Sequence, residues 1–131
     1  MPVIIGVGAA FKFEAGVIRD LEDFATKFKD QLRDIRERIV DPLPVFREAV
    51  YDSAFRDSYS IKSVGPAILG SHFGYKDMQV ADGSAAQRAF EELISSHISD
   101  LRKSQLRQAM LDYCKKDTFV MVELVKWLYK C

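Results

Sequence analysis

The sequence predicts an α/β domain that is dominated by helices and has one clear strand, near its N-terminus. Val3 to Val7 is a short apolar and mostly β-branched run, as expected of a buried strand. From Val17 to Ile39, apolar residues recur at intervals of three and four, as they do on one face of an amphipathic helix. A length of 131 residues suits one modest core, so residues 1–131 are expected to form a single domain.

The strand at Val3 has no visible partner in the sequence. A lone strand cannot form a sheet, so we expect it to pair with a second copy of the chain or with an absent N-terminal segment. Together with the apolar helix faces, an unpaired strand favours a homodimer.

The helix over 17–39 is long for a globular protein and is expected to break once, before Pro42 ends it. A short helix follows over 43–51. Ser60 is placed to cap a brief helix that runs to residue 69.

The C-terminal half is predicted to be helical after a loop over 70–80. Ser84 and Gln87 form a capping box, which predicts a helix over 85–96. Ser99 or Ser104 begins the final helix. Its large aromatic side chains, Phe119 and Trp127, are expected in the core.

Charge and cysteine content favour a cytoplasmic protein without a membrane span. Nineteen basic and nineteen acidic side chains cancel, so no overall positive field attracts nucleic acid. No apolar run approaches the roughly 20 residues that a bilayer requires. Cys114 and Cys131 would lie about 25 Å apart on a continuous helix, well beyond disulfide range, so both should be free thiols.

Tyr113 and Asp117 are the strongest candidates for chemistry. Their spacing of four puts both side chains on one helix face, about one turn apart. A carboxylate there can bind a cation while the phenol orients a metal-bound water. The alternative is a tyrosine ring in the core and an aspartate that faces solvent or caps a helix.

Five segments carry a resemblance to a known family. In chain order they are Arg38-Ile39-Val40-Asp41-Pro42, Ser58-Tyr59-Ser60-Ile61-Lys62-Ser63-Val64-Gly65-Pro66-Ala67, Gly74-Tyr75-Lys76-Asp77, Asp82-Gly83-Ser84-Ala85-Ala86 and Tyr113-Cys114-Lys115-Lys116-Asp117-Thr118-Phe119-Val120-Met121-Val122. They resemble the C-terminal part of a prokaryotic domain of unknown function. That family looks like a branch of the DEDD 3′–5′ exonucleases, so the resemblance implies an incomplete RNase H-like domain that acts on DNA or RNA.

The resemblance also implies roles for individual residues. Tyr113 and Asp117 match the third exonuclease motif, Tyr-x-x-x-Asp, and Glu14 matches the acid of the second. Glu14 and Asp117 would bind Mg²⁺ or Mn²⁺, and Tyr113 would orient the attacking water. Asp41 and Lys62 would contact substrate, although an aspartate before proline is equally often a cap and a lone lysine is usually solvated.

The first exonuclease motif, an Asp-x-Glu pair on a strand, is missing. Asp20 and Glu22 have this spacing, but they lie in the predicted helix, where side chains two apart diverge by about 200°. Two cations need more carboxylates than remain. If the natural gene encodes Asp-x-Glu before Met1, the chain is expected to be an enzyme fragment. If it does not, the alternative is a noncatalytic remnant or association module.

Overall fold

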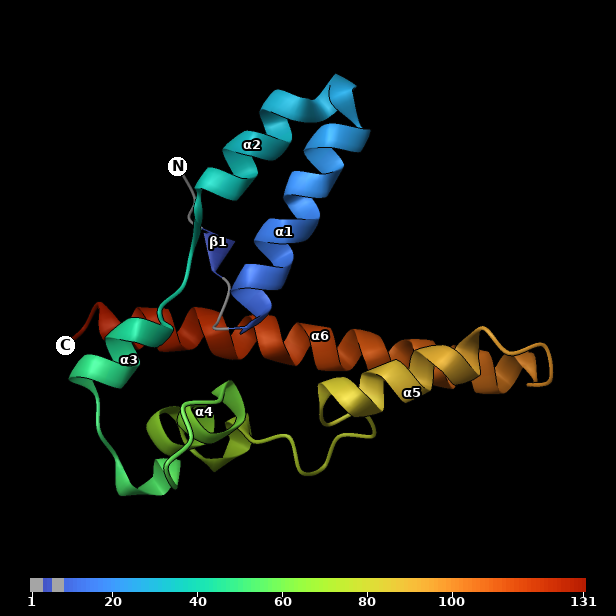
Figure 1. Ribbon diagram of the computed structural model, residues 1–131. Coiled ribbons are helices and arrows are strands. Elements are labelled where there is room, and N and C mark those ends of the chain that lie inside the picture. The colour runs from blue at the N-terminus through green and yellow to red at the C-terminus, as the bar shows by residue number, and fades with distance from the viewer. Residues whose placement is uncertain (1–3, 6–8) are drawn as a thin grey trace. The chain divides into compact units, whose positions relative to one another are not determined.

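The computed structural model describes the backbone of residues 4–5 and 9–131, and side chains from Lys12 onward. The chain divides into two compact units, Met1–Tyr59 and Ser60–Cys131. Each unit is described by itself below, and Figure 1 labels their elements. Helices dominate both units, as the sequence predicts. A single domain over 1–131 stays a prediction.

The first unit begins with a helical hairpin. Helix α1 (Ala9–Phe24) runs antiparallel to α2 (Lys29–Glu37), and a 3₁₀ turn (Thr26–Phe28) connects them (Figure 1). The predicted single break in the long helix is therefore confirmed. Helix α1 starts eight residues before the predicted Val17, because alanines are the commonest residues there and no proline interrupts the segment.

A two-stranded parallel sheet joins the ends of this hairpin. Strand β1 (Ile4–Ile5) pairs with β2 (Ile39–Val40), with Ile4 opposite Ile39 and Ile5 opposite Val40. The expectation that the strand at Val3 lacks a partner within this chain is thus wrong, because the hairpin returns the chain beside it. The other residues of the predicted strand, 3 and 6–7, lie outside the described residues. No larger sheet exists in the described part of the chain, so an RNase H-like fold stays a prediction.

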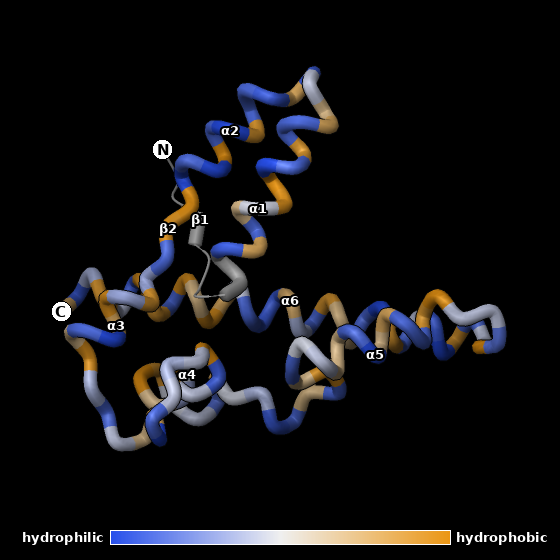
Figure 2. The backbone as a smooth tube through the Cα atoms, viewed as in Figure 1, coloured by the Kyte–Doolittle hydropathy of each residue, from blue (hydrophilic) through white to orange (hydrophobic). Residues whose placement is uncertain are grey.

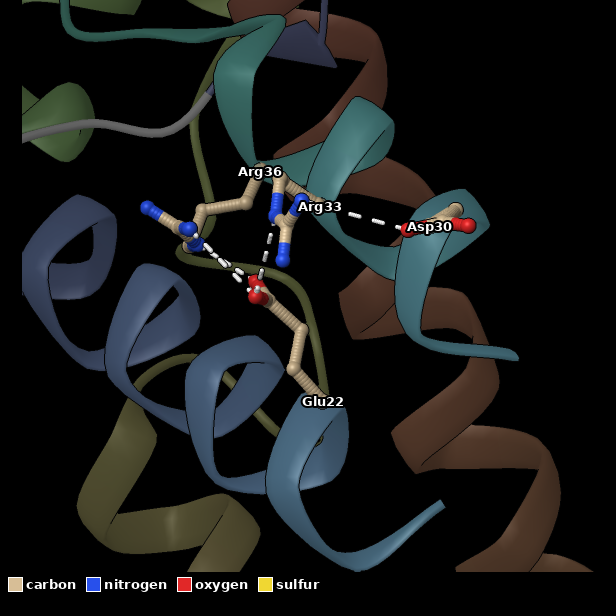
Figure 3. Close-up of polar contacts among 4 residues, drawn as sticks. All are labelled: Glu22, Asp30, Arg33 and Arg36. Atoms are coloured by element: carbon tan, nitrogen blue, oxygen red, sulfur yellow. Dashed lines mark hydrogen bonds and ion pairs between the residues drawn. The ribbon is translucent and has the colours of Figure 1, made fainter. Parts of the chain in front are cut away.

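Glu22 on α1 is held by arginines on α2 (Figure 3). Its side chain is only 5% exposed, and its Oε1 accepts a hydrogen bond from Nε of Arg36 at 2.5 Å, with Arg33 Nε at 4.0 Å from Oε2. This hydrogen bond and the arginine charges lower the pKa of the Glu22 carboxyl. A buried carboxylate needs such partners. Glu22 therefore has a structural role, whereas Asp20 is exposed on the same helix.

The apolar stripe of α1 does not face the core of its unit. Residues Ala15, Ile18 and Glu22 are more buried than the stripe, because the Glu22–Arg36 pair fixes how α1 is rotated against α2. Figure 2 shows apolar segments along α1. The exposed members of the stripe are Phe13, Val17, Leu21 and Phe24. Phe28, in the 3₁₀ turn after α1, is exposed as well.

A short helix and two buried aromatics complete the first unit. Helix α3 (Leu43–Ala49) confirms the helix predicted over 43–51, and a 3₁₀ turn (Ser53–Phe55) follows it. Phe46 and Phe55 are buried, and the Phe55 ring meets the Tyr59 ring edge to face at 5.6 Å between centroids.

The second unit is built on one long helix. Helix α6 (Asp100–Leu128) packs against α4 (Ile61–Leu69) and α5 (Gly83–Leu93). Ser60 and Ser99 cap α4 and α6 through their side chains, as predicted. A 3₁₀ turn (Ser71–Phe73) lies in the segment predicted as loop.

The cap of α5 differs from the prediction. Asp82, rather than Ser84, is the N-cap, and its Oδ1 accepts a hydrogen bond from the Ala85 amide at 2.7 Å. The Gln87 side chain donates to Glu91 instead of reaching back to close a capping box. The helix starts two residues early because aspartate is as good an N-cap as serine.

The core of the second unit lies between α5, α6 and the segment before α5. Its fully buried members are Val80, Ala89, Leu106 and Ala109. Further along α6, Val120 is completely buried where α4 approaches at Gly65. Both cysteines are free, as predicted. Along the part of the chain that the structure describes, no helix is long and apolar enough to cross a membrane.

Candidate functional site

Helix α6 carries Tyr113 and Asp117 one turn apart, as the spacing predicts, and both side chains are half-buried. The Asp117 carboxylate lies near enough to the Tyr113 phenol to raise its pKa. The pair therefore acts electrostatically as a unit.

Tyr75 joins this pair from the segment between α4 and α5. It is only 5% exposed, and its ring meets the Tyr113 ring edge to face, with centroids 6.2 Å apart. Among the described residues, the buried side-chain oxygens that lack a hydrogen-bond partner are Tyr75 Oη and Asp117 Oδ1. Burial is the main cause of a rise in the Tyr75 pKa, and the Asp117 carboxylate adds to that rise.

Lys62, at the start of α4, covers both tyrosines. Its Nζ lies 5.7 Å from the Tyr75 ring centroid and 5.6 Å from that of Tyr113, within cation–π range. Lys62 also helps lower the pKa of the Asp82 carboxyl, although the Ala85 amide has the larger effect. These side chains form a tyrosine–aspartate cluster, which consists of Lys62, Tyr75, Asp82, Tyr113 and Asp117.

Both tyrosines of the cluster favour their neutral form. Burial is the main cause, and it raises the pKa of Tyr113 to about 12, with further contributions from Asp117 and Asp82. Burial raises the pKa of Tyr75 even more. At neutral pH both phenols can therefore donate a hydrogen bond, as a water-orienting tyrosine must.

The remaining predicted site residues lie in the first unit. Glu14 is an exposed side chain on α1. Asp41 Oδ1 accepts a hydrogen bond from the Leu43 amide at 2.9 Å, which forms a local turn just before α3. Glu14 and Asp41 belong to the first unit, whereas Asp117 belongs to the second.

A two-metal centre does not fit the residues at hand. Within the described ranges, 4–5 and 9–131, no three side chains of His, Cys, Asp or Glu gather in a way that could hold a metal ion. Two-metal sites hold both cations about 4 Å apart and need several carboxylates to do so. Asp117 supplies one carboxylate, and the Asp82 carboxylate already accepts a hydrogen bond from the Ala85 amide at the start of α5.

Sequence reasoning missed Tyr75 and Asp82 as members of the cluster. Both stand in segments that carry the family resemblance, at 74–77 and 82–86, so a signal was present. Their roles depend on contacts with Tyr113 across about thirty or more positions, which no local spacing reveals.

Among the comparisons with known proteins, only the one with protein families finds a match, and that match covers the first part of the chain. No curated protein and no solved structure matches the chain. The matching segment covers less than half of the chain and stops before the tyrosine–aspartate cluster. Residues 6–60 match a family described as a domain of unknown function, DUF2779.

Proposed function

We propose that this chain is a relative of the DEDD-type metal-dependent 3′–5′ exonucleases, in which Tyr113 and Asp117 form the third motif of a nucleic-acid-processing site. The observation that carries the proposal is the position of the half-buried Asp117 carboxylate, which lies close enough to the Tyr75 and Tyr113 phenols to raise the pKa of both. The two phenol rings meet edge to face, and the Lys62 ammonium lies over both of them. Such coupled titratable groups are typical of functional sites.

The proposed metal ligand in the second unit is Asp117, with Mg²⁺ or Mn²⁺ as the cation. A divalent cation would polarise the scissile phosphate when bound. Because the described residues do not complete a two-metal centre, Asp117 is expected to hold one cation weakly. The chain alone is therefore expected to have no hydrolytic activity. Asp41 and Lys62 stay the proposed substrate contacts.

Cleavage of labelled single-stranded DNA and RNA, with Mn²⁺ against EDTA, tests this proposal. We expect no metal-dependent ladder from the wild type or from Asp117→Asn. A ladder that Asp117→Asn abolishes would overturn the expected lack of hydrolysis. A metal-dependent ladder that Asp117→Asn leaves unchanged would contradict the role of Asp117.

Mn²⁺-induced broadening of NMR signals tests the ligand role without any need for turnover. We expect broadening centred on Tyr113 and Asp117 that is lost in Asp117→Asn. The matched control is Asp112→Asn, which removes an exposed carboxylate from the same helix and should leave the broadening in place. Broadening that is absent, or equal in both variants, would refute Asp117 as a metal ligand.

A second candidate function is self-association, which the exposed apolar stripe of α1 favours. Phe24 at 89% exposure and Phe13 at 73% are large apolar side chains in open solvent. We expect sedimentation velocity to show a concentration-dependent dimer that Phe24→Glu shifts to monomer. A wild-type chain that stays monomeric up to high micromolar concentration would remove this candidate.

A further inference from the structure

An aromatic stack stands at the surface of the second unit. Phe119 was expected in the core, but it is 51% exposed. Its ring lies nearly parallel to the Phe73 ring, with 5.6 Å between centroids and 12° between planes. The His72 ring adjoins Phe73 at 4.3 Å. These rings come from α6 and from the 3₁₀ turn at 71–73, so the stack is a tertiary feature of this unit.

A lysine is held beside the stack. The Lys116 ammonium donates a hydrogen bond to the His72 carbonyl at 2.8 Å, and its Nζ lies 6.0 Å from the Phe73 ring centroid. The positive charge is therefore fixed at the edge of the stacked rings. Lys115, the next residue on α6, is exposed.

This combination has the chemistry that single-stranded nucleic acids recognise. Bases stack on accessible aromatic side chains, and neighbouring cations meet the phosphates. The exposed part of Phe119 can accept a base, while Lys116 and Lys115 complement the charge of the backbone. Phe119 is two positions beyond Asp117 on α6, so the two side chains diverge by about 200° and the stack lies on a different face of the helix from the candidate site.

We propose that Phe119, supported by Phe73 and flanked by Lys116, is a stacking platform for a base of a single-stranded nucleic acid. The inference rests on the proposed function, since it names the form of nucleic acid that the chain would bind. Binding of this kind requires no metal ion.

Fluorescence anisotropy with a 12-nucleotide labelled oligothymidylate, in EDTA and low salt, tests the platform. We expect Phe119→Ala to weaken binding roughly 5- to 160-fold, because stacking contributes about 1–3 kcal/mol per base. Phe119→Tyr, which keeps an aromatic ring, should bind nearly as the wild type does. Lys116→Gln should weaken binding and reduce the slope of log affinity against log salt concentration by roughly 0.7, the share of one phosphate contact on a single strand.

Phe90→Ala is the matched control. Phe90 is a phenylalanine of similar exposure, 53%, on α5, and its loss should leave the affinity unchanged. Circular dichroism establishes that each variant remains folded. Three outcomes would overturn the platform. The first is no oligonucleotide binding by the wild type at millimolar protein, and the second is an equal loss of affinity in Phe119→Ala and Phe90→Ala. The third is a Phe119→Ala variant that changes self-association in sedimentation velocity but not the affinity for the oligonucleotide.

This experiment separates the two proposals. Binding that depends on Phe119 supports the platform even if the metal assays refute Asp117 as a ligand. Asp117-dependent Mn²⁺ broadening without oligonucleotide binding would leave the proposed function in place and remove the platform.

Discussion

Gly65→Ala is expected to destabilise the second unit by about 1–3 kcal/mol, the usual cost of overpacking a close contact. A Cβ at Gly65 would lie 2.6 Å from Cγ1 of Val120, which is fully buried. Neither side can yield easily, because Gly65 lies inside α4 and Val120 inside α6. The higher helix propensity of alanine offsets up to about 1 kcal/mol of this cost. The free energy of unfolding is measured in urea by the fluorescence of Trp127, the only tryptophan in the sequence.

A double-mutant cycle identifies the cause. In a Val120→Ala background the clashing methyl groups are gone, so Gly65→Ala should cost nothing or stabilise slightly. Gly83→Ala serves as the control, since a Cβ at Gly83 meets no atom within 4 Å and should be nearly neutral. Equal costs for Gly65→Ala in both backgrounds would rule out the contact with Val120 as their source.

Asp117→Asn is expected to lower the pKa of Tyr113 from about 12 toward the ordinary tyrosine value of about 10. A carboxylate beside a phenolate repels it, so loss of that charge makes ionisation easier. The pKa should stop short of the ordinary value, because burial is the largest cause of the shift and remains in the variant. Titration of the Tyr113 Cζ signal by carbon-13 NMR measures the change, with Tyr113→Phe to assign the signal.

The same titration in Asp112→Asn separates a local effect from a general change in charge. Asp112 is exposed on α6, next to Tyr113 in sequence, and is not a cause of the Tyr113 shift. Its substitution should leave the Tyr113 pKa unchanged. If Asp117→Asn also leaves the Tyr113 pKa unchanged, the side chains of Tyr113 and Asp117 are not coupled.

The raised tyrosine pKa values have a consequence for stability. A group whose pKa is higher in the folded state stabilises the fold fully below its unfolded pKa, which is about 10 for tyrosine. This contribution is lost as pH rises from there through the folded value of about 12 for Tyr113. The second unit should therefore lose stability in strong alkali, and Tyr113→Phe should reduce that loss.

Local signals in the sequence determined most of the helices and some of their starts. Ser60 and Ser99 begin helices because a serine side chain satisfies the free amides of a first turn, whatever surrounds it. The spacing of Tyr113 and Asp117 determined that they share a face of α6, since helical geometry alone requires it. The separation of Cys114 and Cys131 likewise determined that no disulfide joins them.

Tertiary structure decided which faces are buried and which groups meet. The apolar stripe of α1 reads as a core face, but the ion pair of Glu22 with Arg36 turns a different face toward α2. Phe119 reads as core, yet it stacks on Phe73 at the surface. Tyr75 reaches Asp117 only because α4, α6 and the segment between α4 and α5 pack together. Such contacts depend on packing between residues far apart in the chain, which no local spacing in a sequence records.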